Sequence, residues 1–477
     1  MSVSLGWALA GVLLTGGLLA QLALHLFEPV LPVTWGYAHL SRHPERVWIA
    51  AFLTIALPPT YAIVWRRLQG VPLAPCTRAR VAMALAAAVA VLAPLSVWAP
   101  MPFLSIDPAV FQVWLMRGEI NQRSDLWLRL LVLVTRPLMP AVEPVRTAYV
   151  VAGVLGGVTM VALVGSARRL ARDRAEALTM ALLACTAFGV VRMSFGVVDS
   201  YPAPLVLMAL FFWTALRALD GDAHPVWPLV IGATGTFWYI GLVLILPATL
   251  VLLVEELRRP THRGRAVVGA SIAAAAAGLA TVPATGRPFA FGDFFAAAAE
   301  QSAVTLGTSP TSSLHSLEAL LSRQRLYDVV NTCMMVDGVG ILCSLTAGTW
   351  LAARLLRHRT WDVRAVMLGA TAAAQLVYLA TFDTLLSPVT QWDPFAPASI
   401  ATALFGGWTL VRWLRRARHL QGWVAGLALA LALVHLLARL DATHLDLERH
   451  EVESPATLIV PQAEPGKEPM ATHGAGC

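Results

Sequence analysis

The sequence predicts an all-α fold, a polytopic transmembrane bundle of about 13 helices, and three observations support this prediction. Of the 477 residues, 57% are hydrophobic and only 13% are charged, with a mean hydropathy of +0.66, whereas soluble domains carry about 25% charged residues. The apolar residues gather in many runs of about 20, the length that a helix needs to cross a bilayer. The runs are continuous, without the alternation at every second residue that a membrane β-barrel requires.

The individual spans are bounded by Gly, Pro and charged residues. The first run begins at Leu5 without a basic segment before it and is long enough to span, so we interpret it as a retained helix. The run from Val226 to Val254 contains three glycines and Pro247, and two short helices that meet near Trp238-Tyr239 fit it better than one tilted helix. The expected spans are 5–27, 48–65, 80–98, 148–166, 176–191, 203–218, 226–239, 241–254, 266–284, 328–353, 363–381, 396–413 and 421–439.

The charges predict how these spans are oriented. All but one of the 35 basic residues are Arg, and most lie in short loops between spans, which is the positive-inside pattern of membrane proteins. If the loop 66–80 is cytoplasmic and 226–254 crosses twice, the cytoplasmic side holds 21 basic and 7 acidic residues, against 14 and 21 outside. We therefore expect a membrane protein with a cytoplasmic N-terminus and an external C-terminus. The net charge of +7 belongs to this pattern, and no nucleic-acid partner is expected.

The chain divides into a transmembrane domain, residues 1–440, and a polar tail, residues 441–477, which lacks periodicity and is predicted to be disordered. Two long segments, 99–147 and 285–327, face outward. The first contains Trp- and Leu-rich stretches with interspersed Arg, a composition typical of helices that lie in the membrane interface. The five cysteines form no CxxC pair and no Cys/His cluster, which argues against a redox or cysteine-metal centre.

Asp107, in the outward stretch Leu104–Phe111, is the first candidate for chemistry. A carboxylate at the outer membrane surface can take a proton from a hydroxyl nucleophile or orient a substrate. An Asp followed by Pro108 is also the usual start of a helix, with Asp as N-cap and Pro at the first helical position. The two interpretations are compatible, because a cap residue can still face a cavity.

A second candidate group is Arg192, Asp199 and Tyr201, in a short outward connection between two spans. Ionisable residues so near the hydrocarbon are costly unless they are paired or line a water-filled cavity. Asp199 and Tyr201 can contact a sugar while Arg192 pairs with a phosphate. A local Arg192–Asp199 ion pair that joins two helix ends explains the same residues.

The third group, Trp392 and Asp393, lies in another outward loop. Taken alone, this loop is an ordinary turn with an interfacial Trp and an Asp-Pro helix start. The agreement between the groups carries more weight, since Asp107, Asp199, Asp383 and Asp393 are all predicted to lie on the same side of the bilayer. Such a grouping suits a lipid-linked anionic substrate whose head group emerges there.

At these residues the chain resembles the GT-C class of integral-membrane glycosyltransferases, and more narrowly bacterial multi-pass proteins related to dolichyl-phosphate-mannose–protein mannosyltransferases. The resemblance rests on four short segments between residues 98 and 414. They are FLSIDPAVF at 103–111, FGVVDSYP at 195–202, LYDVVN at 326–331 and QWDPFA at 391–396. Position 199 is Asp where the pattern has Glu, and position 391 is Gln where it has an acid.

The resemblance implies a protein of the bacterial inner membrane. It would transfer a sugar from a polyprenyl-phosphate donor to a hydroxyl acceptor at the outer face of that membrane. Asp107 would be the catalytic carboxylate, and Asp199, Tyr201, Arg192, Trp392 and Asp393 would contact the substrate. The leaving phosphate would be stabilised by a cation, either Arg192 or a divalent metal. The expected partners are the lipid-linked sugar donor and membrane lipid, while the sequence leaves the oligomeric state undetermined.

Two other functions stay open from the sequence. A secondary transporter or lipid flippase would build a polar site from broken helices near mid-membrane. The departures at Asp199 and Gln391 also fit a GT-C-like membrane protein that has lost its activity.

Overall fold

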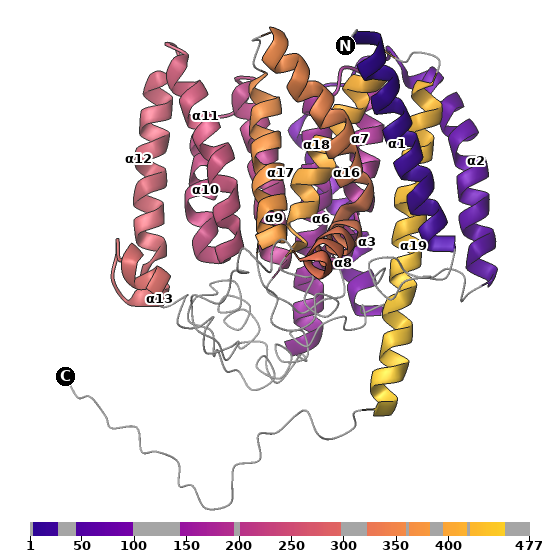
Figure 1. Ribbon diagram of the computed structural model, residues 1–477. Coiled ribbons are helices and arrows are strands. Elements are labelled where there is room, and N and C mark those ends of the chain that lie inside the picture. Colours follow the sequence, from indigo (N-terminus) through magenta and orange to yellow (C-terminus); the bar gives the residue numbers. More distant parts are fainter. Residues whose placement is uncertain are drawn as a thin grey trace, which may run out of the picture.

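The computed structural model describes residues 3–26, 44–98, 144–194, 201–296, 322–358, 362–381, 395–416 and 420–453. Within these ranges every regular element is a helix, and the helices run side by side as a bundle (Figure 1). The first half contains α1 (Val3–Leu26), α2 (Pro44–Leu68), α3 (Arg78–Trp98), α6 (Pro144–Leu170), α7 (Arg174–Thr186), α8 (Phe188–Ser194) and α9 (Pro202–Leu219).

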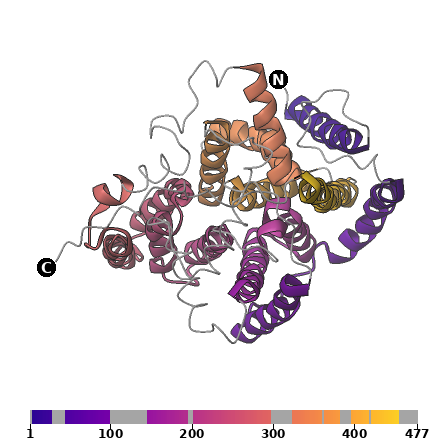
Figure 2. The same cartoon turned by 90° about the horizontal axis from the view of Figure 1, so that it is seen from below.

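The second half continues the same bundle. It contains α10 (Val226–Trp238), the 3₁₀ helix η3 (Ile240–Ile245), α11 (Leu246–Arg258), α12 (Arg263–Ala280), α13 (Val282–Thr285), α16 (Arg323–His358), α17 (Val363–Thr381), α18 (Ala398–Leu414) and α19 (Gln421–Glu453). Viewed from below, α12 lies at one edge of the bundle, and α1 and α2 lie at the other (Figure 2).

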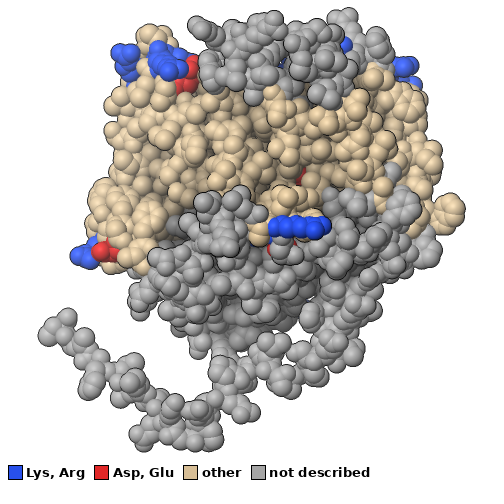
Figure 3. Space-filling model, in the orientation of Figure 1, with Lys and Arg blue, Asp and Glu red and all other residues tan. Residues whose placement is uncertain are grey.

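The bundle has the helices of an integral membrane protein. Six helices (α2, α3, α6, α9, α16 and α17) are long and apolar enough to cross a membrane, and a seventh span results if the bent pair α7 and α8 counts as one. Each of the thirteen expected ranges contains helical residues, although some are divided between two elements, and thirteen crossings stay a prediction. On the face in Figure 3, the charged side chains gather at the two ends and leave the band between them almost free of charge.

The segment Val226–Arg258 confirms the predicted pair of short helices. α10 ends at Trp238, and Tyr239 is extended, with φ −159° and ψ 127°. The 3₁₀ helix η3 then leads into α11, whose first turn contains Pro247. A proline is tolerated at the start of a helix because the first N–H groups have no intrahelical partner.

Breaks that were not predicted include those within 176–191 and 328–353, each expected to be one continuous span. α7 and α8 are bent by 65° at Ala187, and Gly189 of α8 packs so closely on Ser399 that a Cβ would lie 2.9 Å from its Oγ. α16 is interrupted at Asp337, with φ −165° and ψ 70°. There the Asp337 carboxylate accepts a hydrogen bond from the Gly340 N–H at 3.0 Å and so caps the second part of the helix.

The predicted boundaries also need correction at three places. α19 continues to Glu453, whereas the disordered tail was expected from residue 441. Residues 441–453 contain neither Gly nor Pro, and the first proline after them is Pro455, so nothing in this stretch breaks a helix. The expected loops 99–147 and 285–327 are shorter at their C-terminal ends, because α6 begins at Pro144 and α16 at Arg323.

The core lies around α18, whose residues are nearly all buried and which packs on α16, α7 and α17. Peripheral helices instead expose apolar side chains, such as Phe52 and Ile55 on α2 and Val91 on α3. Exposed apolar side chains on the outside of such a bundle are what contact with lipid tails requires. α18 is therefore the element against which the surrounding helices are positioned.

The described basic loops, which the charge pattern predicts to lie on one side of the membrane, are found at one end of the bundle. We call it the basic end. The loop after α2 meets the loop before α7, where Gly70 N–H donates to the Asp173 carboxylate at 3.0 Å. Arg169 and Arg364 both pair with Asp220. The described basic loops therefore share one end, as predicted, and their assignment to the cytoplasm stays a prediction.

Candidate functional site

The candidate site lies at the end of the bundle opposite the basic end. Of the six predicted site residues, the structure describes Arg192 and Tyr201 and places both at this opposite end. Asp107, Asp199, Trp392 and Asp393 lie outside the described residues.

Arg192 lies in the last turn of the short helix α8, and only 2% of it is exposed. A cation in the last turn of a helix is favoured by the partial negative charge of the free carbonyl groups. The position of α8 is fixed against α6, where a Cβ on Gly156 would lie 2.6 Å from the Ser194 carbonyl carbon. A guanidinium this deeply buried needs anionic or hydrogen-bonding groups close by.

Tyr201 precedes α9 and is 6% exposed. Its ring meets the ring of Tyr239 edge to face, with centroids 5.4 Å apart. The hydroxyl groups of Tyr239 and Tyr378 are hydrogen-bonded to each other, and the Tyr378 ring lies 5.3 Å from that of Phe395. We call these four side chains the aromatic cluster.

The aromatic cluster draws on four separate parts of the chain. Its members precede α9, follow α10, lie in the last turn of α17 and precede α18. Tyr side chains combine an apolar ring with a hydroxyl group, and such surfaces suit sugars, which present both C–H and O–H groups. Phe395 is also the fifth residue of the segment QWDPFA, so one end of that motif lies at this site.

Arg325 belongs to the same end of the bundle, and the sequence did not assign it correctly. It was expected in the long outward segment 285–327, but it lies in the first turn of α16 and is 7% exposed. Its guanidinium donates to the carbonyl oxygens of Leu379 and Ala380, each at 3.0 Å. It therefore caps the C-terminal end of α17, next to Tyr378.

A second polar group, which sequence reasoning missed, is buried within the bundle at the break in α16. Asp337 is 4% exposed, and its second carboxylate oxygen accepts a hydrogen bond from Thr402 of α18 at 2.7 Å. Gln21 of α1 donates to the carbonyl oxygen of Gly338 at 3.1 Å. Three helices, α1, α16 and α18, thus meet in a polar layer inside the bundle.

The signal for this polar layer was present in the sequence as Asp337-Gly338-Val339-Gly340, an acidic residue followed by two glycines within an apolar run. An ionisable residue at membrane depth is costly and therefore marks a functional position by default. Here its structural role as a helix cap is equally clear, because both of its oxygens accept hydrogen bonds.

The described residues contain no group of three or more His, Cys, Asp and Glu side chains that could hold a metal ion. The carboxylates that the GT-C resemblance nominates lie in the remaining segments, so the divalent metal stays a prediction. No family model, no curated protein and no solved structure matches this chain.

Proposed function

We propose that this chain is an integral-membrane glycosyltransferase of the GT-C type, with its site at the end of the bundle opposite the basic end. It transfers a sugar from a polyprenyl-phosphate donor to a hydroxyl acceptor at the outer face of a bacterial inner membrane. In this proposal about 13 helices cross the membrane, with the N-terminus in the cytoplasm and the C-terminus outside.

The observation that supports this proposal is that a buried cation and the aromatic cluster lie at the same end of the bundle. Arg192 is 2% exposed at the end of α8, and Tyr201 begins the next helix. A cation suits the phosphate of a lipid-linked sugar, and tyrosines suit the sugar itself.

The proposed chemistry is a direct displacement. The acceptor oxygen bonds to the anomeric carbon of the sugar while the bond from that carbon to the phosphate oxygen breaks. Asp107 takes the proton of the acceptor hydroxyl as general base. The polyprenyl phosphate leaves with the electron pair, and Arg192 stabilises its negative charge. Asp199, Tyr201, Trp392 and Asp393 hold the substrate.

The test uses the purified full-length protein and radiolabelled polyprenyl-phosphate mannose, glucose or arabinose, with bacterial membrane extract as the source of acceptor. We expect the wild type to consume the donor and form labelled product. In Asp107→Asn the rate is expected to fall by a factor of about 100 or more, because a general base contributes about 10²–10⁴-fold. Arg192→Gln is expected to reduce the rate by a similar factor through loss of phosphate stabilisation.

Matched controls come from an exposed ion pair at the same end, Arg287 with Asp293 at 2.5 Å. Asp293→Asn and Arg287→Gln are expected to retain wild-type rates. Full activity of Asp107→Asn would remove Asp107 from the catalytic role. No turnover with any donor, together with wild-type folding, would contradict the proposal.

The polar layer at Asp337 favours a second candidate, a secondary transporter or lipid flippase. Transporters place polar groups where a spanning helix is interrupted, and α16 is interrupted at a buried carboxylate. Solute uptake by reconstituted protein, without sugar transfer, would support this candidate over the glycosyltransferase.

A further inference from the structure

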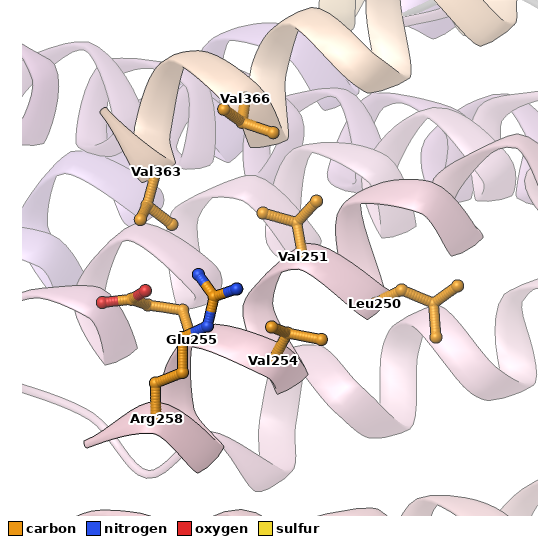
Figure 4. A pocket seen from close by; sticks show the side chains of 7 residues that line it. All are labelled: Leu250, Val251, Val254, Glu255, Arg258, Val363 and Val366. Atoms are coloured by element: carbon orange, nitrogen blue, oxygen red, sulfur yellow. The ribbon is translucent and has the colours of Figure 1, made fainter. Parts of the chain in front are cut away.

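A groove of about 420 Å³ lies between α11 and α17 at the basic end, away from the candidate site (Figure 4). Valines from both helices line it, two from α11 and two from α17: Val251, Val254, Val363 and Val366. Its volume falls within the range of small-molecule sites, about 300–1,000 Å³. The groove is thus large enough for part of an elongated apolar molecule.

The groove runs from the end of the bundle into its apolar band. Its lining extends along α11 from Arg258, in the last turn, back to Leu250, which corresponds to about 12 Å of helix. Leu250 and Val254 are 59% and 45% exposed, so the groove opens sideways onto the apolar surface of the bundle. In a membrane this surface faces lipid tails.

Two charged residues, Glu255 and Arg258, line the mouth of the groove. The other acid and base close by are already engaged, because Glu255 pairs with Arg259 at 3.2 Å and Arg259 also donates to the carbonyl oxygen of Leu219. Arg258 is exposed and forms no hydrogen bond or ion pair with the described part of the chain. Figure 4 shows its guanidinium turned toward the valines of the groove.

Several other arginines at the basic end differ from Arg258 in this respect. Arg169, Arg364, Arg412 and Arg415 each pair with a carboxylate. Arg258 therefore combines three properties that suit one ligand: a free positive charge, a position at the end of the apolar band, and an apolar groove directly beside it.

We propose that the groove between α11 and α17 binds one acyl chain of an anionic phospholipid and that Arg258 holds the phosphate of its head group. The valine walls take the chain, and the open side of the groove lets the lipid enter from the bilayer. A soluble anion would gain nothing from these walls. Since one Arg near the membrane surface is worth about 1 kcal/mol toward anionic lipid, we expect about a fivefold preference over a zwitterionic lipid.

The test reconstitutes the full-length protein in phosphatidylcholine vesicles that contain 2% of a photoactivatable lipid with a diazirine in its acyl chain. One arm uses phosphatidylglycerol, and the other uses phosphatidylcholine. Crosslinked peptides are then mapped by mass spectrometry. For phosphatidylglycerol we expect α11 and α17 peptides to be labelled about five times more than for phosphatidylcholine, and a tenfold excess of unlabelled phosphatidylglycerol to suppress this labelling. Soluble glycerol phosphate is expected not to suppress it.

Two variants and two matched controls complete the test. Arg258→Gln should abolish the fivefold preference, and Val254→Trp should fill the groove and reduce labelling with both lipids. Arg265→Gln and Val267→Trp change equally exposed side chains of α12, where Val267 is 52% exposed, and should leave the labelling unchanged. Equal labelling by the two lipids in the wild type would overturn the proposal, and so would unchanged labelling in both groove variants.

Discussion

At the scale of single residues, Asp337 has two separable properties, a hydrogen-bonding shape and a charge. Its oxygens accept from the Gly340 N–H at 3.0 Å and from Thr402 Oγ1 at 2.7 Å. Asparagine caps a helix as well as aspartate, and its side-chain oxygen can accept one of these bonds. Alanine can accept neither, and it leaves a buried N–H without a partner.

We therefore predict that Asp337→Asn changes the free energy of unfolding by about 1 kcal/mol or less, whereas Asp337→Ala costs about 2–4 kcal/mol. Thermal unfolding in detergent measures both, and Thr402→Ser is the control that keeps the hydroxyl group. An Asn variant as unstable as the Ala variant would show that the charge itself stabilises the fold. If the protein is a transporter, the Asn variant should fold but lose uptake.

The residues that the sequence predicted and those that it missed differ in how far along the sequence their partners lie. Arg192 and Tyr201 are close in sequence, so their shared location follows from one short connection. Arg325 caps a helix whose carbonyl groups lie 54 and 55 residues away. Asp337 is bonded to a hydroxyl 65 residues away. Such contacts depend on the packing of α16 against α17 and α18, which no local pattern encodes.

At the scale of helices, the contact between α6 and α8 decides where Arg192 lies. A Cβ on Gly156 would lie 2.6 Å from the carbonyl carbon and 2.8 Å from the Cα of Ser194, so only glycine permits this approach. We predict that Gly156→Ala displaces α8 and costs about 1–3 kcal/mol, measured by thermal unfolding, with a parallel loss of any activity that depends on Arg192.

The matched control for this prediction is Gly16→Ala in α1, where a Cβ would meet nothing within 4 Å. There alanine should stabilise the helix by up to about 1 kcal/mol, because glycine has more backbone freedom to lose. If both substitutions had the same effect, the contact between α6 and α8 would not be the constraint that we infer.

The same contrast explains which helix breaks could be predicted. The hairpin of α10 and α11 was expected because its glycines, Pro247 and the flanking charges are all local. The bend between α7 and α8 has no comparable local signal, since Ala187 carries no turn chemistry of its own. It coincides with the close packing of Gly189 on Ser399, a contact between distant parts of the chain.

At the scale of the whole molecule, the charge pattern was the most informative part of the sequence. It grouped loops that lie far apart along the chain, and the structure brings the described ones together at the basic end. Ion pairs join them there, for example Arg415 with Glu176 at 2.6 Å and Arg412 with Asp362 at 2.7 Å. Charge counts cannot place Asp107 relative to Arg192, because that distance depends on how a long loop folds.

The two ends should therefore face different compartments, and cysteine labelling can test this. Cys76 is exposed at the basic end, and Arg287, which is 74% exposed at its side chain, lies at the opposite end after α13. In a Cys477→Ser background, we predict that an impermeant maleimide labels Cys76 only in lysed spheroplasts. With Cys76→Ser added, Arg287→Cys should be labelled in intact ones.

This outcome follows from the number of crossings between the two positions. If Val226–Val254 crosses twice, seven crossings separate the two cysteines. These are the crossings from α3 to α12, with α7 and α8 counted as one, and an odd number puts the cysteines on opposite sides. If that segment crossed once, both cysteines would be labelled from the same side. Labelling of Cys76 from outside and of Arg287→Cys only after lysis would invert the orientation and place the candidate site in the cytoplasm. A polyprenyl-phosphate donor at the outer face would then have no access to Arg192 and Tyr201, so the labelling pattern decides whether the proposed function is possible.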